Sequence, residues 1–305
     1  FVKKISDYIT KKVADKLSGM CKTDRENYEK YWDDISPFIK FGCIKDEKFC
    51  ERMMEYVLFK DLDGKYTTMN EYLEAENPTD GDADKVEEKT EEKTEEKADG
   101  EEKEALKTTI YYVTDEIQQS QYINMFREQK MNAVVLKDNI DNPFISHLEA
   151  KNEKVKFQRI DADVTDSMKE EVSEEELKGE TDALTALFRK ALNNDKLEVK
   201  VEKLKNEKVS SMITLSEENR RMQEMMKMYN MYGMDPSMFG GDETLVLNVD
   251  NDLVKYMFEH ADGENVEMFA QQLYDLACLA NKPLAPEAMT AFVARSNKIM
   301  MLLAQ

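Results

Sequence analysis

A run of charged residues at positions 77–104 divides this chain of 305 residues into two parts, because it cannot contribute to a hydrophobic core. The run holds thirteen acidic and five basic residues, and Val86 is its only large apolar side chain. Its repeated Glu-Glu-Lys-Thr motif would place like charges four residues apart on a helix, which disfavours the helix. We therefore expect a solvated linker over residues 77–107, and a functional acidic segment is the alternative.

The overall composition restricts the class of partner. A length of 305 residues predicts two or three domains, and a hydrophobic content of 41% is sufficient for packed cores. The formal net charge of -21 disfavours nucleic acid and anionic membranes, since both require a concentrated basic surface. No apolar run is long enough to span a bilayer and no secretory leader is visible, so we expect a cytoplasmic protein.

Before the linker, apolar residues recur at helical spacing. One helix is predicted over residues 2–17, and a second from Asp24, which can cap it, to near Pro37. A third helix is predicted over residues 47–59, before a turn at Gly64. The first 76 residues are therefore expected to form a three-helix segment.

After the linker the spacing of apolar residues changes. Three β-rich runs alternate with two helical stretches, which predicts a small α/β sandwich subdomain with a mainly parallel sheet over residues 108–176. Such sheets often bind nucleotides, but no glycine-rich phosphate loop follows any of the strands. An enzyme based on this subdomain is therefore disfavoured. The predicted strands are 109–113, 133–136 and 155–160, and the predicted helices end near residue 129 and cover 143–150.

The last part of the chain, residues 177–305, is predicted to be a mixed α/β domain. Helices are expected over 182–192 and 253–261, and strands begin at Leu197 and Leu245. Two amphipathic helices close the chain, and Pro286 suits the first turn of the second. Taken together, the patterns predict an α+β fold that ends in a helical hairpin.

Eight of the twenty methionines lie between Met212 and Met238. Part of this segment reads as a helix that Ser216 can cap and Gly233 can end, with charged residues largely on its other face. Methionine is flexible and polarizable, so a methionine-rich face can bind apolar partners of varied shape. Packing into the domain's own core is the alternative. The residues of this face are Met222, Met225, Met226, Tyr229 and Tyr232.

The closing hairpin has two interpretations, which are packing on its own domain and pairing with a second copy. Burying a large apolar side chain contributes roughly 1.5 to 3 kcal/mol, whereas association costs roughly 4 to 15 kcal/mol. About six such side chains per copy exceed that cost, so we expect a homodimer. The candidate dimerisation residues are Leu273, Leu276, Met289, Phe292, Val293, Ile299, Met300 and Leu303.

Cysteine and histidine give no sign of a metal or catalytic site. The four cysteines lack Cys-x-x-Cys spacing, so we expect small core residues in a reducing compartment. The two histidines, His147 and His260, are expected at the surface or at helix ends.

Several sequence blocks in a fixed order resemble the ninety-kilodalton heat-shock chaperones. The resemblance covers nearly the whole chain outside residues 77–104, and the order of the blocks is more specific than any one of them. The chain ends without the Met-Glu-Glu-Val-Asp tail of the eukaryotic cytosolic members, which suggests the bacterial branch. The blocks are residues 1–13, Glu26-Asn-Tyr-Glu-Lys-Tyr-Trp, Ile39-Lys-Phe-Gly, Thr68-Met-Asn-Glu-Tyr-Leu, Ile110-Tyr-Tyr-Val-Thr and residues 286–303.

The resemblance implies an ATP-dependent, dimeric chaperone that binds unfolded client proteins. ATP and Mg would bind in a nucleotide domain upstream of Phe1, so this part of the chain is expected to hold no cofactor and to hydrolyse no ATP. In the family the methionine-rich helix projects towards the cleft between two protomers and contacts clients. Phe144 and Ile145 are weaker candidates for client contacts on the opposite side of that cleft. The alternative is a non-chaperone dimeric scaffold that docks one fixed partner.

Overall fold

The computed structural model describes residues 2–76, 107–173, 175–228 and 243–304, and it confirms the α+β class. The chain divides into two compact units. The first unit comprises Phe1–Ile110 and Val134–Phe157, and the second comprises Tyr111–Ala133 and Gln158–Gln305.

The first unit begins with three helices, α1 (Val2–Thr23), α2 (Arg25–Lys45) and α3 (Glu47–Met53). The prediction that the second helix ends near Pro37 was wrong, because α2 continues through this residue. Proline removes one helical hydrogen bond, but Ile39 and Cys43 beyond it are buried, and their packing keeps the helix intact.

The third helix is shorter than predicted. It ends at Met53, and after one 3-10 turn (η1, Met54–Tyr56) the chain forms a hairpin of β1 (Leu58–Asp61) and β2 (Tyr66–Thr68). Leu58 and Phe59 are 1% and 3% exposed, so strand pairing and burial favoured a strand over further helix. The predicted turn is confirmed, with Gly64 at a φ of 81°.

After the hairpin, α4 (Met69–Glu76) begins with a capping box. The Glu71 carboxylate accepts a hydrogen bond from the Thr68 backbone N–H at 2.9 Å, and the Thr68 hydroxyl accepts one from the Glu71 N–H at 3.2 Å. Arg25 also donates to the Glu71 carboxylate at 2.9 Å, which joins α4 to the start of α2.

The predicted alternation of strands and helices after residue 107 is confirmed. It consists of β3 (Thr108–Val113), α5 (Ser120–Glu128), β4 (Val134–Val135), α6 (Asp141–Lys151) and β5 (Val155–Arg159). The sheet has five strands in the order β2-β1-β4-β3-β5, and β1 pairs antiparallel with both of its neighbours. The prediction of a mainly parallel sheet therefore missed the antiparallel hairpin of β1 and β2.

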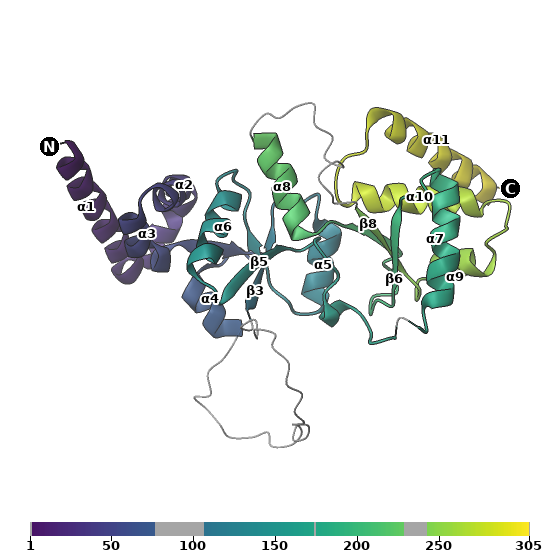
Figure 1. Ribbon diagram of the computed structural model, residues 1–305, viewed down its shortest axis with the longest axis horizontal. Coiled ribbons are helices and arrows are strands. Elements are labelled where there is room, and N and C mark those ends of the chain that lie inside the picture. Colours follow the sequence, from purple (N-terminus) through teal and green to yellow (C-terminus); the bar gives the residue numbers. More distant parts are fainter. Residues whose placement is uncertain (1, 77–106, 174, 229–242, 305) are drawn as a thin grey trace, which may run out of the picture. The chain divides into compact units, whose positions relative to one another are not determined.

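The second unit contains a three-stranded sheet of β6 (Glu198–Glu202), β8 (Thr244–Asn248) and β7 (Ser211–Thr214), in that order. β6 runs parallel to β8 and β7 antiparallel to it. The sequence indicated β6 and β8 but not β7. The surrounding helices are η2 (Asp166–Met168), α7 (Lys178–Leu192), α8 (Glu217–Met228), α9 (Asp252–Glu259), α10 (Val266–Leu279) and α11 (Pro286–Leu303) (Figure 1).

One face of this sheet and the helices α7, α9 and α10 enclose the core of the second unit. Phe188, Leu245, Leu247 and Met257 are fully buried there. The two closing helices are confirmed, and Pro286 lies in the first turn of α11 as predicted. The hairpin of α10 and α11 lies at the C-terminal end of the chain (Figure 1, yellow).

Candidate functional site

The helix α8 carries the first of the methionines predicted to bind clients. The Ser216 hydroxyl accepts a hydrogen bond from the Asn219 backbone N–H at 3.4 Å, which confirms the predicted cap. Met222 is half-buried. Met225 and Met226 lie on the helix but their side chains are outside the described part, and Tyr229 and Tyr232 lie outside the described residues altogether.

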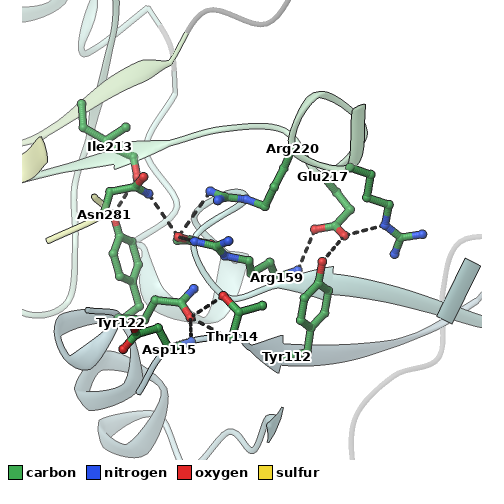
Figure 2. Close-up of polar contacts among 12 residues, drawn as sticks. Tyr112, Thr114, Asp115, Tyr122, Arg159, Ile213, Glu217, Arg220 and Asn281 are labelled. Atoms are coloured by element: carbon green, nitrogen blue, oxygen red, sulfur yellow. Dashed lines mark hydrogen bonds and ion pairs between the residues drawn. The ribbon is translucent and has the colours of Figure 1, made fainter. Parts of the chain in front are cut away.

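The first turn of α8 is attached to the rest of the second unit through Glu217 (Figure 2). Its carboxylate accepts hydrogen bonds from the Tyr112 hydroxyl at 2.6 Å and from the Arg159 backbone N–H at 2.8 Å. Arg221, one turn along α8, donates to the same carboxylate from Nε at 2.7 Å. Glu217 therefore links the start of α8 to the ends of β3 and β5.

A second attachment of α8 is a buried cluster of polar and charged residues around Asp161, and Figure 2 labels its members Arg159, Arg220 and Asn281. Asp161 is fully buried and accepts hydrogen bonds from Arg159 Nε at 2.8 Å and Nη2 at 2.9 Å. Asn281, which follows α10, donates to the same carboxylate at 3.1 Å. Arg220 of α8 places its Nη2 atom 3.3 Å from Asp161 Oδ2.

This cluster is buried. Arg220 is 6% exposed, and burial lowers the pKa of its guanidinium although Asp161 opposes the shift. The neighbouring Tyr122 is 2% exposed and donates its hydroxyl to the Ile213 carbonyl at 2.6 Å. Burial raises the pKa of Tyr122, so this hydroxyl stays protonated and remains a donor.

Sequence reasoning did not identify this cluster. The sequence pattern placed charged residues largely on the other face of the methionine helix, and it gave Arg220 no role. The available signal was Asp161, an acidic residue two positions after the end of β5. An aspartate in that position is rarely buried without a partner, so it predicts a cation nearby but does not say which one.

The candidate dimerisation residues separate into core and surface positions. Leu273 is 2% exposed and belongs to the core of its own unit, so it was wrongly assigned to an interface. Phe292 and Ile299 are half-buried on the side of α11 that carries the contacts with α10. The remaining five are exposed, namely Leu276 (47%), Met289 (37%), Val293 (50%), Met300 (58%) and Leu303 (85%).

The orientation of α11 on α10 is fixed by polar contacts. Ser296 Oγ accepts a hydrogen bond from Gln272 at 2.9 Å, and Arg295 donates to Gln272 at 2.9 Å. Arg295 also pairs with Asp275, where both side chains are largely buried. No residue of α11 is fully buried. Met289, Val293 and Met300 form an exposed apolar stripe next to the side of α11 that packs on α10.

The two weaker client-binding candidates are not at a surface. Phe144 and Ile145 of α6 are both 0% exposed within the first unit. A fully covered side chain offers no area to a partner, so the assignment of these residues to an exposed wall was wrong. They stabilise the interior instead.

The cysteines are buried and unpaired, as predicted for core residues. Cys50 lies 3.5 Å from His147 Nε2, and burial raises the pKa of its thiol. Within the described ranges, no three His, Cys, Asp or Glu side chains are grouped as metal ligands. None of the helices in those ranges has the length and apolar character needed to cross a bilayer.

Comparison with known proteins agrees with the sequence resemblance. The model of the Hsp90 protein family matches residues 1–83 and 100–304. The chain is 34% identical over 273 residues to Chaperone protein HtpG of Bacteroides thetaiotaomicron, and 32% identical over 275 residues to that of Porphyromonas gingivalis. These alignments cover 86% and 87% of this chain and 36% of each relative, so the chain spans about a third of their length. The chain belongs to the Hsp90 protein family.

Proposed function

We propose that this chain is the middle-to-C-terminal part of an ATP-dependent, dimeric, cytoplasmic chaperone that binds unfolded or partly folded client proteins. The family membership supports a chaperone role, and the curated relatives are named as chaperones. ATP and Mg would bind to parts of the protein outside this chain. In this proposal nucleic acid and membranes are not partners.

The proposed domains follow the family's arrangement. Residues 1–76 form the end of a middle domain, 77–107 a linker, 108–176 the small subdomain, and 177–305 the dimerisation domain. The client site is the methionine segment that begins with α8.

One observation supports the client site more than any other. The first turn of α8 contains no methionine, and it is held by the Glu217 carboxylate, which accepts hydrogen bonds from the Tyr112 hydroxyl and the Arg159 backbone N–H. These hydrogen bonds involve no methionine side chain, and a methionine-rich face suits partners of varied shape.

The site is tested by replacing Met222, Met225 and Met226 with serine in the 305-residue chain. Binding of a labelled, permanently unfolded polypeptide, measured by fluorescence anisotropy, should weaken at least tenfold, because each buried methionine contributes about 1.5 kcal/mol or more. The matched control replaces Glu218, Glu224 and Lys227, which lie largely on the other face of the same helix, with serine.

The control should bind like the unmodified chain. Equal affinity of the methionine variant and the control would refute the site. Binding of a single partner, with no affinity for several unrelated unfolded polypeptides, would favour the fixed-partner scaffold.

A further inference from the structure

Two cysteines of the first unit, Cys43 of α2 and Cys50 of α3, meet at a tight corner between their helices. Only Asp46 separates α2 from α3, and its carboxylate accepts a hydrogen bond from the Phe49 backbone N–H at 3.1 Å, which caps α3. The helices approach so closely that a Cβ on Gly42 would lie 2.8 Å from the Phe49 ring. At this corner the Cys43 thiol donates a hydrogen bond to the sulfur of Cys50.

Cys50 also contacts a histidine from a distant part of the chain. Its Sγ atom lies 3.5 Å from Nε2 of His147, which belongs to α6 of the same unit. Because Cys43 already donates to the Cys50 sulfur, the proton of Cys50 can point at the imidazole nitrogen. Cys43, Cys50 and His147 thus form a relay that ends at a base, and a thiol beside a base is the arrangement of an activated nucleophile.

The surroundings of Cys50 connect it to the surface and control its charge. Cys50 is 0% exposed, but His147 is only half-buried, so its imidazole lies between the thiol and solvent. Lys151 of α6 favours the thiolate, whereas Glu47 and Glu51 of α3 disfavour it. Burial has the largest effect and raises the pKa of this thiol. Cys50 is therefore protonated at neutral pH and needs a base to become a nucleophile.

We propose that Cys50 and Cys43 form an oxidation site at which hydrogen peroxide converts the two thiols into a disulfide. His147 takes the proton of Cys50, and the thiolate attacks one peroxide oxygen. The O–O bond breaks, Cys50 becomes a sulfenic acid, and the leaving hydroxide takes the proton from His147 to form water. The Cys43 sulfur then attacks the Cys50 sulfur, the S–O bond breaks, and the Cys43 proton leaves with the hydroxide as a second water. Two thiols are oxidised and one peroxide is reduced to two waters.

The other two thiols have neighbours of a different kind. Cys21 lies 3.5 Å from Nη1 of Arg25, a cation that cannot accept its proton. Cys278 accepts a hydrogen bond from the Tyr274 hydroxyl. Neither contact supplies a base or a second thiol, so peroxide should select Cys50 among the four cysteines. This site goes beyond the proposed chaperone function and does not depend on it.

Peptide mapping of the peroxide-treated 305-residue chain tests the site. After treatment the chain is unfolded, its free thiols are alkylated with N-ethylmaleimide, and its peptides are identified by mass spectrometry. Two of the four thiols should be lost to a disulfide between Cys43 and Cys50, and dithiothreitol should restore both. Because the mapping uses the unmodified chain, it does not depend on the folding of a variant. Oxidation of all four thiols at one rate, or of neither Cys43 nor Cys50, would overturn the proposal.

Single serine variants test the order of the two steps. Cys43→Ser should stop at the sulfenic acid, which dimedone traps on Cys50. Cys50→Ser should give no dimedone adduct, since the remaining thiol of Cys43 has no base beside it. Cys21→Ser is the matched control and should form the disulfide at the rate of the unmodified chain. A dimedone adduct on Cys43 in Cys50→Ser would contradict the assignment of Cys50 as the nucleophile.

The role of His147 has a separate readout in the pH dependence. His147→Gln should slow disulfide formation at least about tenfold near about pH 7, because a positioned base contributes roughly 10²–10⁴-fold. Since burial raises the pKa of Cys50, both rates should still be rising at about pH 9, and they should converge as the thiolate forms without a base. His260→Gln is the matched control, in the second unit, and should leave the rate unchanged. Equal rates for the two histidine variants near neutral pH would refute the part of His147 in the reaction.

Discussion

The exposed stripe on α11 gives the most quantitative prediction for dimerisation. Val293 and Met300 are 50% and 58% exposed, so about half of the roughly 1.5 to 3 kcal/mol for burying each side chain is still to be gained. In a symmetric dimer the two positions supply four side chains, or about 4 kcal/mol. Replacing both with serine should therefore raise the dimer dissociation constant about a thousandfold.

Sedimentation equilibrium over a series of protein concentrations measures this constant. Met301→Ser is a matched control, because Met301 is 60% exposed but lies about 100° around the helix from Met300. The control should leave the constant nearly unchanged. Both variants should give the far-UV circular dichroism spectrum of the unmodified chain, since the altered side chains are exposed within one copy. A double variant that dimerises as tightly as the control would refute the assignment of this stripe to the interface.

Two further predictions concern the first unit. Gly19→Ala should stabilise it by about 0.5 to 1 kcal/mol, since a Cβ at Gly19 meets nothing within 4 Å. Gly42→Ala should destabilise it by about 1 to 3 kcal/mol, since a Cβ at Gly42 would lie 2.8 Å from the buried Phe49 ring. Urea unfolding in which both substitutions change the stability in the same direction would contradict this reasoning. Burial alone would raise the pKa of Glu71, but hydrogen bonds from the Thr68 N–H and from Arg25 outweigh it and lower the pKa below the ordinary 4.5. The contribution of Glu71 to the free energy of unfolding is therefore present above that value and lost as the pH falls below it. The difference in unfolding free energy between the unmodified chain and Glu71→Gln should shrink from about pH 6 to about pH 3. A difference that stays constant over this range would disprove the role of these hydrogen bonds.

The sequence predicted the helices and strands that are marked by the spacing of their own apolar residues or by a proline at their start. Alternating apolar residues marked β6 and β8, and Pro286 marked the start of α11. The failures came where tertiary packing decided the structure. Leu58 and Phe59 fit a helical period equally well, and only pairing with β2 and β4 made them a strand. Pro37 should end a helix locally, but buried residues on both sides of it keep α2 continuous.

The functional residues show the same division. The exposed positions on α11 were found because an amphipathic stripe is readable from spacing alone. The cluster of Arg159, Asp161, Arg220 and Asn281 was not found, since these residues meet only in the folded unit; Asp161 and Asn281, for example, are 120 positions apart. Periodicity also cannot tell a buried apolar face from an exposed one, which is why Leu273 was assigned to an interface although it lies in the core of its own unit.

The central claim is that one dimeric protein presents the methionine segment to unfolded clients. Sedimentation velocity of the 305-residue chain, mixed with a fluorescent polypeptide that cannot fold, tests it directly. The account predicts that the label sediments with a species of two chains, and that the variant with serine at Met222, Met225 and Met226 forms the same species without the label. A label that never sediments with the chain, or that sediments equally with the variant, would contradict the account.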